Sequence, residues 1–235
     1  MATYQGPGFN GKIDNLVFFT RNGKQVVRTM PGKVRQTAAT KIRSRNFGIA
    51  SSSCKTLRWL LQPVLFNPTD RNMQLRFSGA VARWLAQSNA ETLAPQQQIP
   101  FVTGFSFSKQ TSVAERCRLP FTVSNPVAGQ TLVQLPAFIP TATIAAPAHT
   151  NMVQLTITVA ACHLLNARAA GSETKQLLLP YNNTPVAAQD IEFNVAAETG
   201  VLLITAVQIL YRLQNGNTDM RDEFMPASVV DGRYG

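Results

Sequence analysis

Few side chains in this sequence could perform catalysis. The chain has two histidines, His149 and His163, and three cysteines, Cys54, Cys117 and Cys162. An adjacent Cys162 and His163 could suggest a nucleophile with its base, or two metal ligands. Neighbouring residues of a strand point to opposite faces, so this pair is poorly suited to one centre. We therefore predict that both residues belong to the core.

The acids and glycines carry no cofactor pattern either. The acids near the C-terminus lack the spacing of a calcium-binding loop. Gly6, Gly8 and Gly11 do not link a strand to a helix, as the glycines of a phosphate-binding loop would. The sequence predicts a protein that is not an enzyme, with no cofactor and no metal.

Basic residues give the strongest chemical signal. The first sixty residues hold eleven Lys and Arg against one acid, Asp14, whereas the rest of the chain holds eleven of each sign, so the net charge of +10 lies in the N-terminal segment. Such an excess attracts polyanions or acidic neighbouring subunits. The candidate contacts are Arg28, Lys33, Arg35, Lys41, Arg43, Arg45, Lys55 and Arg58. Three acids, Asp219, Asp222 and Glu223, are candidate partners on an adjacent copy.

The elements that position these charges begin with a predicted hairpin. Two apolar runs, 13–20 and 25–30, flank Asn22-Gly23, a pair typical of type I′ turns because both turn residues need positive φ. The preceding glycine-rich segment, residues 6–11, is interpreted as a flexible arm or as a stack of tight turns, of which the arm is the more common in proteins. The sequence thus begins with a short strand pair behind a mobile lead.

Helical periodicity follows the hairpin. Apolar residues at three- and four-residue steps predict helices over 37–61 and 70–87. On the first helix Lys41, Arg45 and Lys55, with Arg58 beside them, share a solvent face. The apolar stripe of the second helix is expected to pack against the first helix or a neighbouring subunit.

Beyond residue 100 the apolar period changes to two. Seven segments are predicted to be strands: 101–107, 119–123, 131–139, 153–159, 175–179, 191–195 and 201–213. Short strands separated by turn residues favour an antiparallel β-sandwich. The predicted fold class is α+β, with a hairpin and two helices (1–90), a sandwich (100–214) and a polar C-terminal tail (215–235).

Composition and short sequence patterns indicate the cellular location of the protein. Apolar residues make up 45% of the chain and charged residues only 14%. No apolar run is long enough to cross a membrane, the N-terminus lacks the pattern of a signal peptide, and the cysteines are odd in number and widely spaced. We expect a cytoplasmic protein, or one built into an assembly there.

The first 65 residues contain a recognisable set of short runs: Gly11-Lys12, the run Asn15 to Phe19, Asn22-Gly23-Lys24, Val27-Arg28, and Pro31 with Lys33-Val34, followed by Arg45, Phe47, Ala50, Leu57 and Leu61. In these runs the segment resembles a family of uncharacterised Bacteroidetes proteins. The resemblance implies a hairpin and helix unit joined to a β-rich half, and a bacterial source. It implies no activity.

Two functions fit these observations. The first is a non-enzymatic subunit of a filament, tube or shell, present in many copies and linked through its terminal arms by charge, so that salt weakens assembly. The second is a nucleic-acid-binding or packaging protein that uses the basic segment, with Phe47 or Trp59 available for stacking. A sandwich that binds carbohydrate or peptide through its loops is a third.

Overall fold

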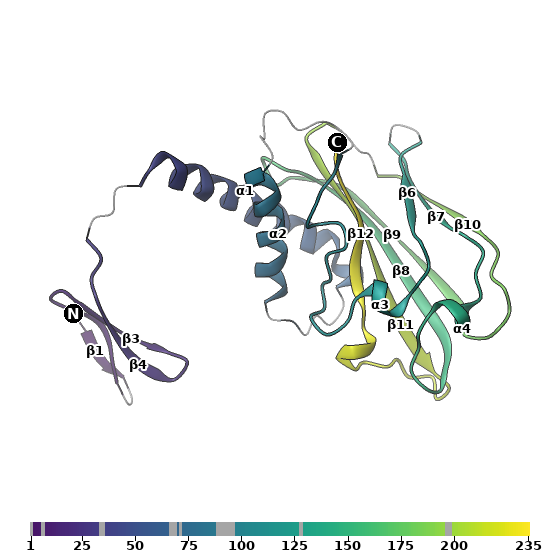
Figure 1. Ribbon diagram of the computed structural model, residues 1–235, viewed down its shortest axis with the longest axis horizontal. Coiled ribbons are helices and arrows are strands. Elements are labelled where there is room, and N and C mark those ends of the chain that lie inside the picture. The colour runs from purple at the N-terminus through teal and green to yellow at the C-terminus, as the bar shows by residue number, and fades with distance from the viewer. Residues whose placement is uncertain are drawn as a thin grey trace. The chain divides into compact units, whose positions relative to one another are not determined.

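The computed structural model describes residues 2–5, 8–32, 36–65, 70, 72–87, 97–126, 129–195 and 199–235. They form two compact units, Met1–Lys41 and Ile42–Gly235. The α+β class is confirmed: helices accompany three antiparallel sheets (Figure 1). The sequence predicts the division near residues 89–100, of which 89–96 lie outside the described residues.

The first unit is a meander of four antiparallel strands. They are β1 (Ala2–Gln5), β2 (Gly8–Ile13), β3 (Leu16–Arg21) and β4 (Lys24–Thr29). The predicted hairpin is the β3–β4 pair, and its turn has positive φ at Asn22 (51°) and Gly23 (76°). The glycine-rich lead is not a flexible arm, because residues 8–11 belong to β2 and pair with β1. The hairpin is therefore half of a larger sheet.

Two antiparallel helices precede the sandwich, and the first four residues of the first helix belong to the first unit. Helix α1 (Ala38–Leu60) begins after Thr37, whose hydroxyl accepts the amide of Thr40, and helix α2 is Met73–Gln87. A 3-10 turn, η1 (Gln62–Val64), follows α1. The Asn46 amide donates to the Leu85 carbonyl near one end of the pair. The predicted stripe on α2, from Met73 to Trp84, is buried.

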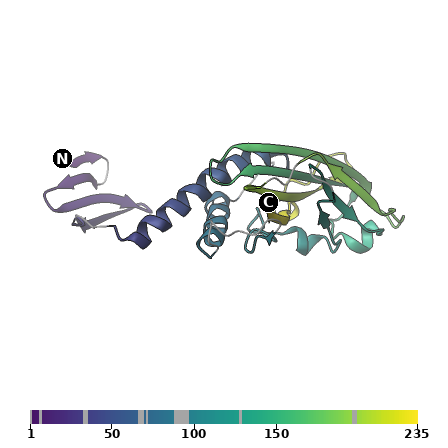
Figure 2. The ribbon, with the colours of Figure 1, turned by 90° about the horizontal axis from the view of Figure 1, so that it is seen from above.

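The body of the second unit is a β-sandwich. Its larger sheet has the order β5 (Gln97–Gln98), β12 (Ala227–Tyr234), β11 (Val201–Leu213), β8 (Thr150–His163) and β9 (Ala169–Pro180). The smaller sheet has the order β10 (Gln189–Phe193), β7 (Thr131–Leu135) and β6 (Thr122–Ser124). The long strands run side by side in Figure 2.

Two cores cover the two faces of the larger sheet. Odd-numbered residues of β8 and β11, such as Ile157 and Val207, pack against the smaller sheet. Even-numbered residues near one end, such as Cys162 and Leu202, pack against α1 and α2. Because both faces are covered there, β11 is a nearly continuous buried run. This packing joins the helices to the sandwich in one unit.

Two short helices connect the sheets. Helix α3 (Val113–Arg116) has a capping box formed by Ser112 and Glu115, and α4 (Pro140–Thr143) begins with proline. A second 3-10 turn, η2 (Asp222–Phe224), precedes β12. Of these elements, α3 has a side-chain cap, whereas α4 and η2 have none.

Two sequence predictions for the sandwich are wrong. Residues 101–107 begin as a turn, with positive φ at Phe101 and Gly104, and the segment meets β12 through separate hydrogen bonds from residue 103 onward rather than as a strand. Residues 215–235 are not a free tail, because β12 lies between β5 and β11 and Val229 is buried. The short apolar run of β12 is broken by Asp231 and Gly232, which hides its strand character in the sequence.

Candidate functional site

The N-terminal sheet has two chemically distinct faces. Residues opposite one another on neighbouring strands share a face, so the register assigns each side chain. One face, here called the uncharged face, contains Phe9, Ile13, Leu16, Phe18 and Val27, with Thr20, Gln25 and Thr29. The rings of Phe9 and Phe18 lie 6.2 Å apart on it. Gln25 reaches across this face to donate to the Phe9 carbonyl.

The uncharged face is left without cover by its own unit. No described side chain of residues 8–41 is buried, and Phe9, Ile13, Leu16 and Val27 are 40–49% exposed. A sheet ordinarily gains its stability by burying one apolar face. Full burial of these side chains would add roughly 1 kcal/mol each. The sheet therefore presents a surface that is suited to a partner.

The opposite side, here called the basic face, carries Lys12, Arg21, Lys24 and Arg28 around Val17, Phe19 and Val26. All four cationic side chains are exposed. The Arg28 guanidinium lies 5.7 Å from the centre of the Phe19 ring. Of these cations, only Arg28 was among the predicted contacts. Alternation along the predicted β3–β4 hairpin could have identified Arg21 and Lys24, whereas Lys12 also required the pairing of β2 with β3.

The other predicted basic contacts lie on or near α1. Lys33 and Arg35 lie outside the described residues, and Lys41 ends the first unit. Arg43, Arg45 and Lys55 are exposed on the helix, as are Phe47 and Trp59, the latter at 69%. Arg58 is half-buried and donates to Gln74 of α2 at 3.1 Å, so it contributes to helix packing. The predicted set is thus divided between a sheet and a helix.

The predicted acidic contacts differ in accessibility. Asp219 is buried and pairs with Arg221 at 2.6 Å, and this hydrogen bond lowers the pKa of its carboxyl. Asp222 is half-buried and Glu223 is exposed. Arg221 and Arg116 lie on the Phe224 ring at 4.5 and 4.6 Å. Asp219 therefore serves the fold, which corrects its assignment to an exposed acidic tail.

The residues that resembled a nucleophile and base lie in unreactive surroundings. Cys162 is fully buried beneath α1, and burial raises the pKa of its thiol to about 11. Burial also raises the pKa of Cys54 to about 12. The next strand residue, His163, is only half-buried. Within the described ranges, no three His, Cys, Asp or Glu side chains gather where they could hold a metal ion.

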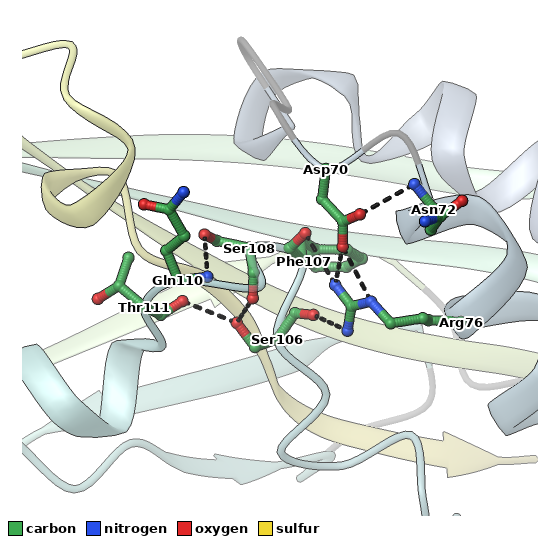
Figure 3. Close-up of polar contacts among 8 residues, drawn as sticks. All are labelled: Asp70, Asn72, Arg76, Ser106, Phe107, Ser108, Gln110 and Thr111. Carbon is green, nitrogen blue, oxygen red and sulfur yellow. Dashed lines mark hydrogen bonds and ion pairs between the residues drawn. The ribbon is translucent and has the colours of Figure 1, made fainter. Parts of the chain in front are cut away.

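A polar cluster at the start of α2 is structural rather than chemical. Asp70 accepts from Arg76 and from the Asn72 amide, and Arg76 also donates to the carbonyls of Ser106 and Phe107 (Figure 3). The Arg76 hydrogen bond lowers the pKa of the Asp70 carboxyl. Every group in this cluster is engaged by another part of the chain. The cluster holds the backbone of Ser106 and Phe107 against α2.

A cavity of about 350 Å³ lies beside α3. Two of its lining hydroxyls are already engaged, since Ser112 caps α3 and Ser228 accepts the Val113 amide. Much of the remaining lining is apolar, including Leu119 and Phe121. These groups do not converge on a point in the cavity as a specific small-molecule site would require.

Comparison with known proteins assigns no family to this chain. No family model matches the chain, and no curated protein is significantly similar to it in sequence. The resemblance of the first 65 residues to a Bacteroidetes family stays a prediction. Among the described residues, no helix combines the length and apolar content needed to cross a bilayer.

Proposed function

We propose that this chain is a non-enzymatic structural subunit that self-assembles into a filament, tube or shell through its N-terminal sheet. The observation that carries the proposal is the uncharged face, an apolar sheet surface that the first unit leaves open. Packing two such faces would bury roughly ten apolar side chains, worth roughly 10 kcal/mol before the cost of association.

Charge determines how two copies of the sheet could meet. The four cations of the basic face repel their counterparts on another copy, and the described part of the first unit offers only Asp14 in return. Two copies can therefore approach with least repulsion when their uncharged faces meet and their basic faces point away. Sheets packed face to face lie about 10 Å apart, a spacing that Phe and Val side chains fill.

This arrangement changes the salt response expected from the sequence. Assembly through charged arms would weaken as salt rises, whereas apolar faces on two basic sheets should associate equally well or better when salt screens their repulsion. The burial of Asp219 also removes one of the acids that the charge-linked arrangement would use.

Val26 and Val27 provide a matched test. They are consecutive residues of β4 on opposite faces, Val26 on the basic face and Val27 on the uncharged face. We expect Val27→Asp to weaken assembly at least about 30-fold, because a charge would lie in an apolar interface, and Val26→Asp to leave it nearly unchanged. Light scattering after size-exclusion chromatography measures both.

Two outcomes would contradict the proposal. Equal loss in both variants would indicate general damage to the sheet, and no loss in Val27→Asp would show that another surface joins the copies. The comparison is sharp because Val26 is the more covered of the two in a single chain. Damage to the isolated sheet would therefore affect Val26→Asp more than Val27→Asp.

A further inference from the structure

The four cations of the basic face are arranged in two pairs. Arg21 and Lys24 are directly opposite each other at the end of the β3–β4 hairpin. Lys12 and Arg28 flank Val17 on the strands either side of β3. Arg21 lies four positions after Val17 in β3, which corresponds to about 13 Å along the strand. The pairs thus mark the two ends of a short path across the sheet.

An aromatic ring lies between the two pairs. Phe19 occupies the middle of this path, opposite Val26, and the Arg28 guanidinium lies over it. A planar guanidinium and an aromatic face are the two surfaces on which unpaired bases stack. Phosphates at the two ends and a base between them would match this order of charge, ring and charge. A lipid headgroup or an acidic peptide would use the charges but not the ring.

We propose that the basic face binds single-stranded nucleic acid, with the two cationic pairs on phosphates and Phe19 under a base. This inference uses the side of the sheet opposite the uncharged face, so it does not depend on assembly. Double-stranded nucleic acid is disfavoured because its bases are stacked within the helix and are not free to lie on Phe19.

Fluorescence anisotropy with the full chain and a labelled oligothymidylate tests the proposal. Four phosphate contacts on a single strand predict a slope of about −2.8 in log affinity against log salt. Affinity should therefore fall about 50-fold from about 50 mM to about 200 mM salt. The double variant Arg21→Gln with Lys24→Gln should halve the slope, and Phe19→Leu should weaken binding at least about five-fold.

A matched control removes the same charge from α1. Arg45→Gln with Lys55→Gln lowers the net charge equally and changes the exposed side of the helix near Trp59. We expect this control to retain the affinity and slope of the unmodified chain. If it loses binding instead, while the hairpin variant does not, the helix is the contact surface and the proposal is wrong.

Competitors distinguish the ligand classes. Inorganic polyphosphate and vesicles containing phosphatidylserine carry negative charge without bases, so they should displace the oligothymidylate weakly. Displacement as strong as that by unlabelled oligothymidylate would show charge attraction alone and would overturn the proposed stacking, as would a Phe19→Leu variant with full affinity. Circular dichroism verifies that the substitutions leave the fold intact.

Discussion

Replacing Phe77 with alanine tests how α2 is held on the sandwich. Phe77 is fully buried, and its ring lies 5.2 Å from Phe105 and 5.6 Å from Phe107. Phenylalanine-to-alanine changes in a core cost about 3–5 kcal/mol. We expect the upper part of that range, because two aromatic pairs worth roughly 0.5–1.5 kcal/mol each are lost with the ring. Phe77→Leu, which keeps most of the volume, should cost roughly 1–2 kcal/mol.

Urea unfolding followed by circular dichroism measures these changes in the free energy of unfolding. Leu75→Ala is the control, because Leu75 lies on the same helix and is 63% exposed. Its cost should stay within about 0.5 kcal/mol. A loss below about 1 kcal/mol for Phe77→Ala would refute the reasoning, since a side chain in such a cluster cannot be removed that cheaply.

Two further predictions concern ionisable groups. The pKa values of the Asp70 and Asp219 carboxyls are lowered by Arg76 and Arg221, so their stabilisation is present above the unfolded pKa of about 3.9 and is lost as pH falls through the folded values. Asp70→Asn and Asp219→Asn should each flatten the fall of the urea midpoint with acidification below about pH 5; an unchanged acid response would exclude that ion pair as its source. The raised thiol pKa values of Cys54 and Cys162, together with their burial, predict that Ellman's reagent labels them only in denaturant. Rapid labelling of either thiol in the native chain would show that α1 opens readily from the sheet.

The sequence could predict the elements whose periodicity is strong and local. Val201–Leu213 coincides with a predicted strand, and the helix expected over 37–61 is α1. Asn22-Gly23 identified its turn because few residue pairs accept positive φ at both positions. Local chemistry was sufficient in these cases.

Pairing between segments that are distant in the chain could not be predicted from local residue patterns. β12 is a strand because it lies between β5 and β11, and its own residues, interrupted by Asp231 and Gly232, show little strand pattern. Arg21, Lys24 and Arg28 share a face through the predicted β3–β4 hairpin, but Lys12 joins them only through the register of β2 with β3, a strand pair that the sequence did not predict. The buried pairing of Asp219 with Arg221 likewise follows from tertiary packing.

The most direct measurement of self-assembly through the uncharged face is the molar mass of the purified, nuclease-treated chain over a range of concentrations at low and high salt. The chain has a mass of 25.7 kDa. We predict a species of at least twice this mass, whose share rises with concentration and which persists in high salt. A single species of 25.7 kDa under all conditions, or assemblies that dissociate as salt rises, would contradict the account.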